Sequence, residues 1–583
     1  MSDLTPHPET FADNTRIAVS SKSEPIANQK PRSDDGTIIL HWLTAFSMVA
    51  SLLTGLRISA DGQFTTWAKA LDKLLPVGEI WTWHFAASAA LFFCTISYFI
   101  YVRRAVLGER NSSHRLRTLT SPTTYRLRLR AINVALHWFA YGAIIVLSIS
   151  GTILYFGYGG LFVTLHKALA WAMLFYIGIH TITHFLYGGV SQLLRLFRPQ
   201  QLLANKGAKP WPLLLATIIG LILLSSLYAL DLTTRATVVV AKVSTPPTVD
   251  GKLDDTIWDK VAAITVETHQ GANLGDSGSS SVFLKAVRTD KKIYFAFRWQ
   301  DPTRSLMRSP TIKKSEGWYV MSKGGGVADV VDYYEDKFAV LFSHTDKYGG
   351  GGSTFLGDKP LAAYPKSPHG RGLHYTQDGR IMDMWQWKSS RGGMLGHMDD
   401  MYFGPPKKPT EKQLSGNKRY AGGYEADPGA AIYEYNYIAD GPNGYNSPVR
   451  LKRLPLDLTA MRYQLGSIPA NANGSNTEAS QWWMTNENSI PYDTGLDATI
   501  PLGTILPSSL NIHDYHGDRA DLTARARWKD GYWTLEVSRK LDTKSPYDMG
   551  FHKGTRVYLW VSVFDHNQTR HTRHQRPIQL DIE

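Results

Sequence analysis

Cysteine is almost absent from this sequence. The one cysteine, Cys94, lies inside an apolar run of the 583-residue chain. A disulfide bond within one chain is therefore excluded. A CxxCH motif, to which haem is attached covalently, is excluded for the same reason, so any haem in this protein would be bound non-covalently.

The first 35 residues have few apolar side chains. They are rich in Ser, Pro, Asn and Asp, and they lack the apolar core of a cleavable signal peptide. A segment of this composition buries too little apolar surface to fold. We therefore predict that residues 1–35 form a disordered cytoplasmic tail.

Basic residues are unevenly distributed. The formal net charge is +13, and many arginines gather in residues 101–130, YVRRAVLGERNSSHRLRTLTSPTTYRLRLR. This segment lies between two apolar runs, which is typical of a cytoplasmic loop beside membrane spans. The charge thus indicates membrane topology, and binding of nucleic acid is not expected.

Five stretches are long and apolar enough to cross a lipid bilayer as helices, which takes about 20 residues. They lie near 37–57, 80–102, 131–156, 162–187 and 211–230. With the arginine-rich loop in the cytoplasm, the helices alternate in direction and the fifth runs outward. The sequence predicts a protein of the bacterial cytoplasmic (inner) membrane with five transmembrane helices, a cytoplasmic N-terminus and a periplasmic C-terminal domain.

The first two of these helices resemble the next two. IILHWLTAFSMVASLLTGLRIS and VALHWFAYGAIIVLSISGTILYFG both carry His-Trp near their start, and a glycine follows each histidine by fourteen residues, from His41 to Gly55 and from His137 to Gly151. Two-fold repeats of this kind are common in membrane proteins. The fifth helix contains no histidine, so we interpret it as a tether.

Several histidines lie inside the apolar runs, where polar side chains are costly and usually functional. His166 and His180 are fourteen residues apart on the fourth helix. Fourteen residues make nearly four turns and rise about 21 Å, so both side chains share one face at opposite membrane depths. Two iron sites stacked across the bilayer need this arrangement.

Each iron site needs a second ligand at the same depth. His84 is at the outer end of the second helix, level with His166, and His41 is at the inner end of the first, level with His180. We therefore expect the pairs His84 with His166 and His41 with His180. Pairing of His137 with His180 stays open as an alternative. Two imidazole ligands leave haem iron without an open position, so such sites carry electrons.

Gly55 lies on the helix of His41 but at the depth of the other haem, where a side chain would collide with the macrocycle. Gly151 is the equivalent position in the repeat. A proton relay or a metal transporter would also use buried histidines. Those functions usually add buried carboxylates, which these helices almost lack.

The bundle resembles a known family. LHWLTAFSMVASLLTG in the first helix, WHF in the second and the histidine pair of the fourth are similar to the cytochrome b subunits of nickel-iron hydrogenases and respiratory formate dehydrogenases, over about residues 37–190. The resemblance implies a four-helix unit with two haem b groups that exchanges electrons with membrane quinone. It implies four axial ligands: His41, His84, His166 and His180. The second His-Trp copy, at His137, departs from the family pattern.

The remainder of the chain has the pattern of a β-rich domain. KKIYFAFRWQD, DKFAVLFSH, GYWTLEVSRKL and TRVYLWVSVFD are rich in aromatic and β-branched residues between Gly, Pro, Asp and Asn. We predict a multi-domain protein in which an all-α haem bundle with a tether helix precedes an all-β sandwich. The expected domains are the tail 1–35, the bundle 36–190, a cytoplasmic loop with the fifth helix 191–235, and the periplasmic sandwich 236–583.

A second resemblance covers about residues 245–583. PPTVDGKLDDTIWDKVAAI, RIMDMWQWKSSR and VFDHNQTRHTRH are similar to the haem-binding domain related to the γ subunit of ethylbenzene dehydrogenase. That family is a β-sandwich akin to carbohydrate-binding modules. The resemblance implies a third haem b near the loop end of the sandwich, with axial ligands drawn from Met, Lys or His.

The ligands of this third haem are less clearly indicated. The stretch SPHGRGLHYTQDGRIMDMWQWK offers His369 and His374. The expected pair is His374 with His571, and His369 is the next choice. Lys388 is either a ligand or a partner of a haem propionate.

Other residues of this region are interpreted as packing residues. Trp385 and Trp387 alternate along a predicted strand and so share one face. Methionines near aromatic residues usually fill cores. We therefore expect a packing role for Met382, Met384, Met394 and Met401. His566, His571 and His574 have no cysteine partners for a zinc site.

The sequence thus predicts a membrane-bound b-type cytochrome. It would carry electrons between the quinone pool and a periplasmic cytochrome or oxidoreductase subunit, through two membrane haems and one periplasmic haem. No catalytic residue is predicted, and whether the protein is itself an enzyme stays open. In one alternative, the periplasmic haem site itself oxidises or reduces a small substrate. In another, the sandwich is a haem-free module that binds a carbohydrate or another ligand.

Overall fold

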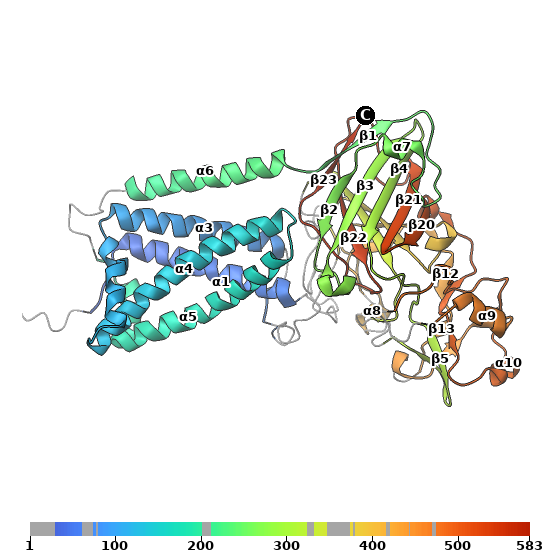
Figure 1. Cartoon of the computed structure of the whole chain (residues 1–583), viewed down its shortest axis with the longest axis horizontal. Coiled ribbons are helices and arrows are strands. Elements are labelled where there is room, and N and C mark those ends of the chain that lie inside the picture. Colours follow the sequence, from blue (N-terminus) through green and yellow to red (C-terminus); the bar gives the residue numbers. More distant parts are fainter. Residues whose placement is uncertain are drawn as a thin grey trace, which may run out of the picture.

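The structure is a computed structural model. It describes residues 30–60, 71, 74–76, 80–200, 211–322, 332–346, 374–376, 379–415, 420–441, 444–468 and 474–583. A helical N-terminal part and a β-rich C-terminal part lie end to end (Figure 1). The tail predicted at 1–35 falls almost entirely outside the described residues.

Four helices are long and apolar enough to cross a membrane, as predicted. They are α1 (Asp35–Ala60), α3 (Ile80–Arg104), α4 (Tyr125–Tyr155) and α5 (Leu161–Leu193). α1 packs against α3 and α4 packs against α5, so each copy of the sequence repeat forms one helix pair. Two short 3₁₀ helices, Gly108–Asn111 and Ser113–Leu119, lie in the arginine-rich loop between the pairs.

Two helix boundaries differ from the expected ones. α4 begins at Tyr125 rather than near 131, because its first turns carry exposed arginines that a helix can hold outside the apolar layer. α5 extends to Leu193 but is kinked at Gly188 and Gly189, where the backbone leaves helical geometry. Gly189 has φ 61°, a conformation that favours glycine.

The fifth predicted helix is α6 (Trp211–Thr233), which runs alongside the bundle (Figure 1). It packs against α3, where the Phe93 ring lies so close to Gly220 that a Cβ there would come within 2.0 Å of it. Its apolar part, Thr217–Thr233, is shorter than the other four spans. A fifth crossing and the orientation of the chain in the membrane therefore stay predictions.

The C-terminal part is built on one 12-stranded sheet. Its strand order is β10-β9-β8-β7-β22-β23-β1-β3-β4-β21-β20, and β2 also pairs with β3. In that order the strands are β10 (Tyr424–Ala426), β9 (Asp399–Phe403), β8 (Met382–Lys388), β7 (Lys337–Ser343), β22 (Val557–Phe564), β23 (Ile578–Ile582), β1 (Thr237–Lys242), β3 (Ser280–Arg288), β4 (Lys292–Gln300), β21 (Tyr532–Lys540) and β20 (Thr523–Lys529), with β2 at Ile264–Thr268.

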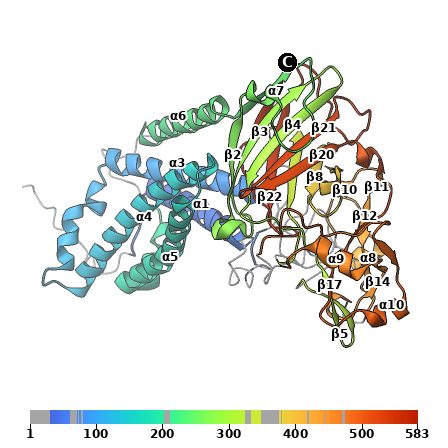
Figure 2. The same cartoon turned by 45° about the vertical axis from the view of Figure 1, so that its right-hand side comes forward.

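The sheet curls so that its two halves face each other, as Figure 2 shows. β1 joins the halves, because Thr237–Val240 pair with β23 and Ala241–Lys242 pair with β3. Phe295 on β4 packs against Phe342 on β7 and Trp385 on β8, with ring centroids 5.6 and 5.5 Å apart. The β-rich domain is confirmed, and its two layers belong to one continuous sheet.

The pattern of buried residues along each strand depends on whether one or both faces of the sheet are covered. β3 alternates because one of its faces is turned to the core. β8 is buried at all seven positions because short insertion segments cover its outer face. Trp385 and Trp387 lie fully buried in the core, and Met382, Met384 and Met401 form an apolar cluster on the other face of the sheet. These side chains pack, as the sequence indicated.

Smaller elements lie over one end of the sheet. The additional strand pairs are β11 (Gly429–Ala430) with β19 (His516–Gly517), β12 (Tyr433–Tyr435) with β18 (Ser509–Asn511), β13 (Tyr437–Ile438) with β14 (Arg450–Leu451), and β15 (Arg453–Pro455) with β16 (Ser489–Pro491). A three-stranded sheet contains β17 (Ile505–Leu506), β5 (Thr311–Lys314) and β6 (Gly317–Val320). The short helices are α7 (Thr256–Asp259), α8 (Glu411–Leu414), α9 (Leu458–Leu465) and α10 (Thr494–Thr499).

The β domain is docked on one end of the bundle. His269, just after β2, lies with its Nε2 2.7 Å from the carbonyl oxygen of Gly157 in the loop between α4 and α5. Arg576 donates to Asp231 of α6 at 3.0 Å, and Tyr155 of α4 donates to the same carboxylate at 3.1 Å. These contacts hold α4, α6 and the sheet together at a single junction.

Candidate functional site

Two of the predicted ligands meet at the end of the bundle that carries the β domain. The rings of His84 on α3 and His166 on α5 have centroids 6.5 Å apart and planes inclined at 73°. Phe85, next to His84, packs edge-to-face against Tyr155 at the domain junction. We call His84 and His166 the outer pair.

Each imidazole of the outer pair is oriented by a hydroxyl group. Thr54 Oγ1 lies 3.0 Å from Nδ1 of His84, and Ser150 Oγ lies 3.0 Å from Nδ1 of His166. Both hydroxyls donate their own hydrogen to a backbone carbonyl, at Ala50 and Leu147 respectively. The oxygen therefore accepts the Nδ1 hydrogen, which leaves Nε2 as the nitrogen that can ligate a metal.

The two repeat glycines lie directly against these rings. A Cβ on Gly55 would come within 3.3 Å of Cε1 of His84, and one on Gly151 within 3.2 Å of Cε1 of His166. The nearest group to each glycine is thus the imidazole itself. Because the glycine has no side chain, its helix can come close to the ring. The repeat predicted that these glycines were equivalent, and they are.

The outer pair has the spacing of a bis-imidazole site. A metal–imidazole bond is about 2.0 Å long, so two imidazoles on one iron have ring centroids about 6.3 Å apart. The measured 6.5 Å matches that value. Together with the fixed Nδ1 atoms, this separation fits a haem b held between His84 and His166.

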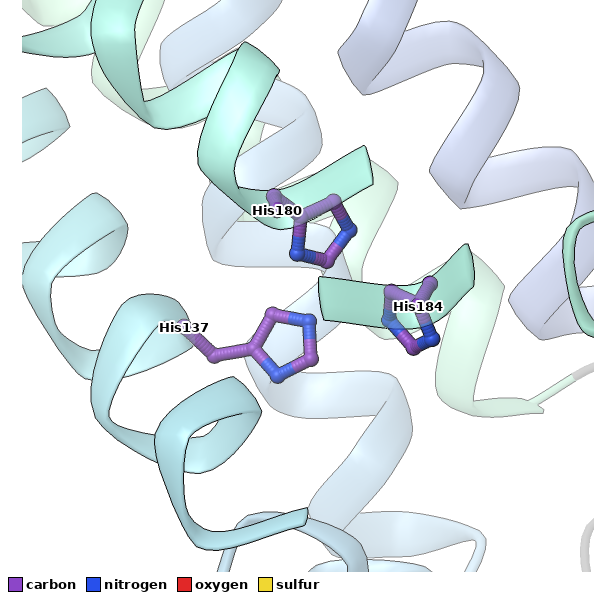
Figure 3. A group of neighbouring side chains, drawn as sticks. All are labelled: His137, His180 and His184. Carbon is purple, nitrogen blue, oxygen red and sulfur yellow. The ribbon is translucent and has the colours of Figure 1, made fainter. Parts of the chain in front are cut away.

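A second group of histidines lies further along α5. Figure 3 shows His137 from α4 and His180 and His184 from α5, with their ligand nitrogens within 4.8 Å of one another. The His137 and His180 ring centroids are 5.1 Å apart, and those of His180 and His184 are 4.7 Å apart. We call these three residues the inner cluster.

His41 lies at the same end of the bundle. It is near enough for a charge on its ring to interact with each of the three histidines of the inner cluster. The Nδ1 atom of His180 is buried and has no hydrogen-bond partner among the described residues. A buried polar atom without a partner is costly and indicates a missing group. Imidazole nitrogens suit haem or another metal centre as donors, but the 5.1 Å between the His137 and His180 rings is shorter than the separation of about 6.3 Å in a bis-imidazole pair. Both expected pairings of His180 stay predictions.

Sequence reasoning missed Thr54 and Ser150, and for His184 it left a packing role and a functional role open. Thr54 and Ser150 immediately precede the two repeat glycines, so a hydroxyl before each glycine was a signal available in the repeat. His184 is one helical turn after His180, a spacing that places both on one face.

The predicted ligands of the β domain are not brought together. His374 stacks on Phe403 at the end of β9, whereas His571 packs against Phe564 at the end of β22. Strand pairing carries Tyr402, the neighbour of Phe403 on β9, across β8 and β7 to Leu559 on β22. Leu559 is five residues, or about 16 Å, from Phe564. The two histidines therefore lie at opposite ends of the strands. His369 lies outside the described residues.

Lys388 is buried in a charged cluster on the outer face of β8. Its Nζ contacts Asp399 and lies 3.0 Å from the hydroxyl of Tyr433, and Asp399 also accepts from Arg519 at 2.9 Å. Burial lowers the pKa of Lys388 to about 8, while Asp399 opposes the shift. The ammonium group is thus already paired with a carboxylate.

The histidines near the C-terminus contact neighbouring groups of the β domain itself. Val561 N–H donates to Nε2 of His574 at 3.0 Å, and the Nδ1 of His574 lies 2.8 Å from the carbonyl of Arg576. Burial lowers the pKa of His574 to about 4. His566 contacts Asp565, and the Nδ1 of His571 lies 2.7 Å from the carbonyl of Thr572.

Fold and site together define a class of protein: a histidine-rich bundle of four helices long and apolar enough to cross a membrane, joined to a β-rich domain. Two family models match these two parts. The model for prokaryotic cytochrome b561 matches residues 32–199, and the model for ethylbenzene dehydrogenase matches residues 255–576. Since the second match covers more than half of the chain, this protein belongs to the ethylbenzene dehydrogenase family, with an N-terminal cytochrome b561 domain. Cytochromes b561 bind haem b in the membrane and transfer electrons.

Solved structures similar to this chain include a family 9 carbohydrate-binding module from Caldicellulosiruptor kristjanssonii. Its complex with glucose is 8% identical, with a TM-score of 0.22 over 60% of this chain and 95% of that chain. Its complex with cellotriose is 10% identical, with a TM-score of 0.19 over 60% and 94%. These scores are too low to indicate a function. A comparison with curated proteins gives no match.

Proposed function

We propose that this protein is a di-haem membrane cytochrome that carries electrons between quinone and a redox partner on the side of its β domain. The observation that carries the proposal is the outer pair, whose rings are 6.5 Å apart with each Nδ1 fixed by a hydroxyl. Haem b supplies reversible one-electron oxidation and reduction at its iron. His84 and His166 bind one haem, and His180 binds the second with His41 or His137.

The second haem and the quinone belong to the other end of the bundle in this proposal. Next to His41, an apolar groove of about 630 Å³ is lined by Ile38, Ile39, Trp42, Phe46, Phe197 and Pro199, among other residues. Trp42 packs against Phe197 at 5.0 Å and so fixes one wall of the groove. An apolar groove beside a redox site suits a lipid-soluble quinone, and the b561 family implies that a membrane quinone is used.

The β domain is proposed to receive or supply electrons at the outer pair. Phe85, Tyr155 and Asp231 form a continuous set of contacts from His84 to Arg576 of the β domain. With the arginine-rich loop in the cytoplasm, this end of the bundle and the β domain are periplasmic. The domain boundaries 36–190, 191–235 and 236–583 follow from the same assignment.

A third haem in the β domain stays a prediction, and the positions of His374 and His571 do not support this pair as its ligands. Haem quantification on the purified full-length protein separates the possibilities. About two haems per chain support the proposed function, and about three would add a haem in the β domain. A chain that binds no haem after expression with excess haem precursor would refute the proposal.

The quinone step is tested in proteoliposomes that contain a short-chain quinol. Trp42→Ala and Phe46→Ala should slow reduction of the haems by quinol at least severalfold without changing haem content. Leu227→Ala, on the apolar surface of α6, serves as the matched control. Equal rates in all three variants would place the quinone elsewhere.

A further inference from the structure

Four aspartates converge inside the β domain, away from the histidines. Asp383 is on β8, Asp400 is on β9, Asp427 follows β10, and Asp548 lies in the loop between β21 and β22. In the strand register Asp400 is opposite Trp385, so Asp400, Asp383 and Trp385 point to the same inner face of the sheet. We call these four residues the aspartate cluster.

The cluster faces too little positive charge. Arg539, from β21 in the opposite half of the sheet, donates to Asp383 at 2.7 Å and lies 3.6 Å from both Asp400 and Asp548. Within the described part of the chain, no second basic side chain comes within 4.0 Å of the cluster. One guanidinium therefore contacts three of the four carboxylates, and up to three negative charges of the cluster are left without compensation.

Most of the carboxylate oxygens also lack a donor. Both oxygens of Asp400, Asp427 and Asp548, and Oδ1 of Asp383, are buried and accept no hydrogen bond among the described residues. Asp427 is only 3% exposed and adds a fourth buried carboxylate to the other three. Uncompensated carboxylates in a dry interior cost several kcal/mol each, so a proton or a cation has to neutralise them.

Burial makes the ionised form of these carboxylates costly. Burial, and then the negative charge of Asp548, raise the pKa of Asp427 to about 8. Burial, opposed by Arg539, raises the pKa of Asp383 to about 6, and burial together with Asp383 raises the pKa of Asp400.

Two other buried groups of this domain have more partners than the aspartate cluster. On the outer face of the same strands, Asp399 contacts both Lys388 and Arg519. In the group Asp336, Asp565 and His566, Asp336 accepts backbone N–H bonds from Ser305 and His566. Among the residues that the structure describes, the aspartate cluster has only Arg539 and the backbone N–H of Met549 as donors, and both donate to Asp383.

We propose that the aspartate cluster binds one calcium ion. Ligand oxygens of Asp383, Asp400 and Asp548 lie within 4.8 Å of one another, which is the largest separation of two oxygens that share one ion at about 2.4 Å. Calcium takes six to eight oxygen ligands in flexible geometry, so four carboxylates from separate strands and loops suit it better than magnesium, which demands an octahedron. The ion would tie β8, β9, β10 and the β21–β22 loop together.

The experiment uses the full-length protein in detergent, dialysed against chelating resin and then titrated with CaCl₂. We expect about one tightly bound calcium per chain by elemental analysis. We also expect calcium to raise the unfolding temperature of the β domain, followed by circular dichroism, by several degrees over EDTA. Tb³⁺ should replace calcium and luminesce on tryptophan excitation, because Trp385 lies next to Arg539.

The variants separate a calcium site from mere packing. Asp400→Asn and Asp427→Asn should bind calcium at least tenfold more weakly, while Asp581→Asn, an exposed aspartate on β23, should bind as the unchanged protein does. In EDTA the two cluster variants should be more stable than the unchanged protein, because they remove repulsion, and in calcium they should be less stable. Two results would overturn the proposal: no bound calcium with equal unfolding temperatures in calcium and EDTA, or Mg²⁺ binding at least as tight as that of calcium.

Discussion

The histidines of the membrane bundle and those of the β domain are used in opposite ways. In the outer pair, each Nδ1 is held by a hydroxyl and the two rings stand at the spacing of a metal-bridged pair. In the β domain, His574 uses both nitrogens on the protein's own backbone, and His269 uses both at the domain junction. An imidazole is therefore a candidate ligand when its second nitrogen is left without a protein partner, whereas burial alone does not make it one.

The largest expected effect is the loss of the outer haem in His166→Ala. The remaining His84 cannot supply both axial ligands, so haem content should fall from about two to about one per bundle, and one of two redox transitions should disappear. Haem extraction and redox titration measure both. His114→Ala, in the exposed arginine-rich loop, is the control. Unchanged haem content in His166→Ala would show that the outer pair is not a haem site.

Substitutions in the inner cluster should have an equally large effect. They also decide whether His41 or His137 is the partner of His180. His180→Ala should remove the inner haem under either pairing. His41→Ala and His137→Ala should differ, because the inner redox transition disappears only when the second axial ligand, the partner of His180, is replaced. If His180→Ala retains both transitions, the inner haem is held by other residues.

A smaller effect is expected from the structural histidine His574. Its pKa is lowered to about 4 in the folded protein against an ordinary value near 6.5, so the unfolded state binds more protons as the pH falls from 6.5 to 4. The free energy of unfolding of the β domain should decrease by about 3 kcal/mol across this window. His574→Gln should lose that part of the pH dependence, and His552→Gln, at an exposed position, should keep it.

The smallest effect is expected from the hydroxyl groups that orient the ligands. Thr54→Val removes the acceptor for Nδ1 of His84 but keeps the shape of the side chain, so the outer haem should be retained roughly 10- to 100-fold less tightly. Transfer of haem to apomyoglobin measures this loss. Thr181→Val, whose hydroxyl contacts only its own helix in an exposed position, is the control. An equal rate of haem transfer from both variants would mean that Thr54 has no part in orienting His84.

Prediction from the sequence succeeded where a pattern is local. The helical spans and the equivalence of Gly55 and Gly151 follow from residue spacing along one chain, because a helix fixes depth and face by its rise and turn. The meeting of His84 with His166 was predicted for the same reason. The partner of His180 was not fixed, because His41 and His137 have the same spacing in the two repeats and only packing distinguishes them.

The β domain shows the limit of such reasoning. His374 and His571 were paired because both lie near segments that resemble the family, yet strand order places them at opposite ends of the sheet. The aspartate cluster was not predicted at all. Its four members are far apart in the sequence. The hydrogen bond from Met549 to Asp383, for example, joins residues 166 positions apart.

The sequence by itself determined that this protein has an apolar helical part with histidines at two depths and a β-rich part after it. Hydropathy and helical periodicity depend on residues that are close together along the chain, so these features can be predicted from the sequence. Only the tertiary structure decided which side chains meet: the hydroxyls beside the outer pair, the inner cluster, the domain junction and the aspartate cluster. These contacts depend on strand order and helix packing, which bring together residues that no local pattern connects.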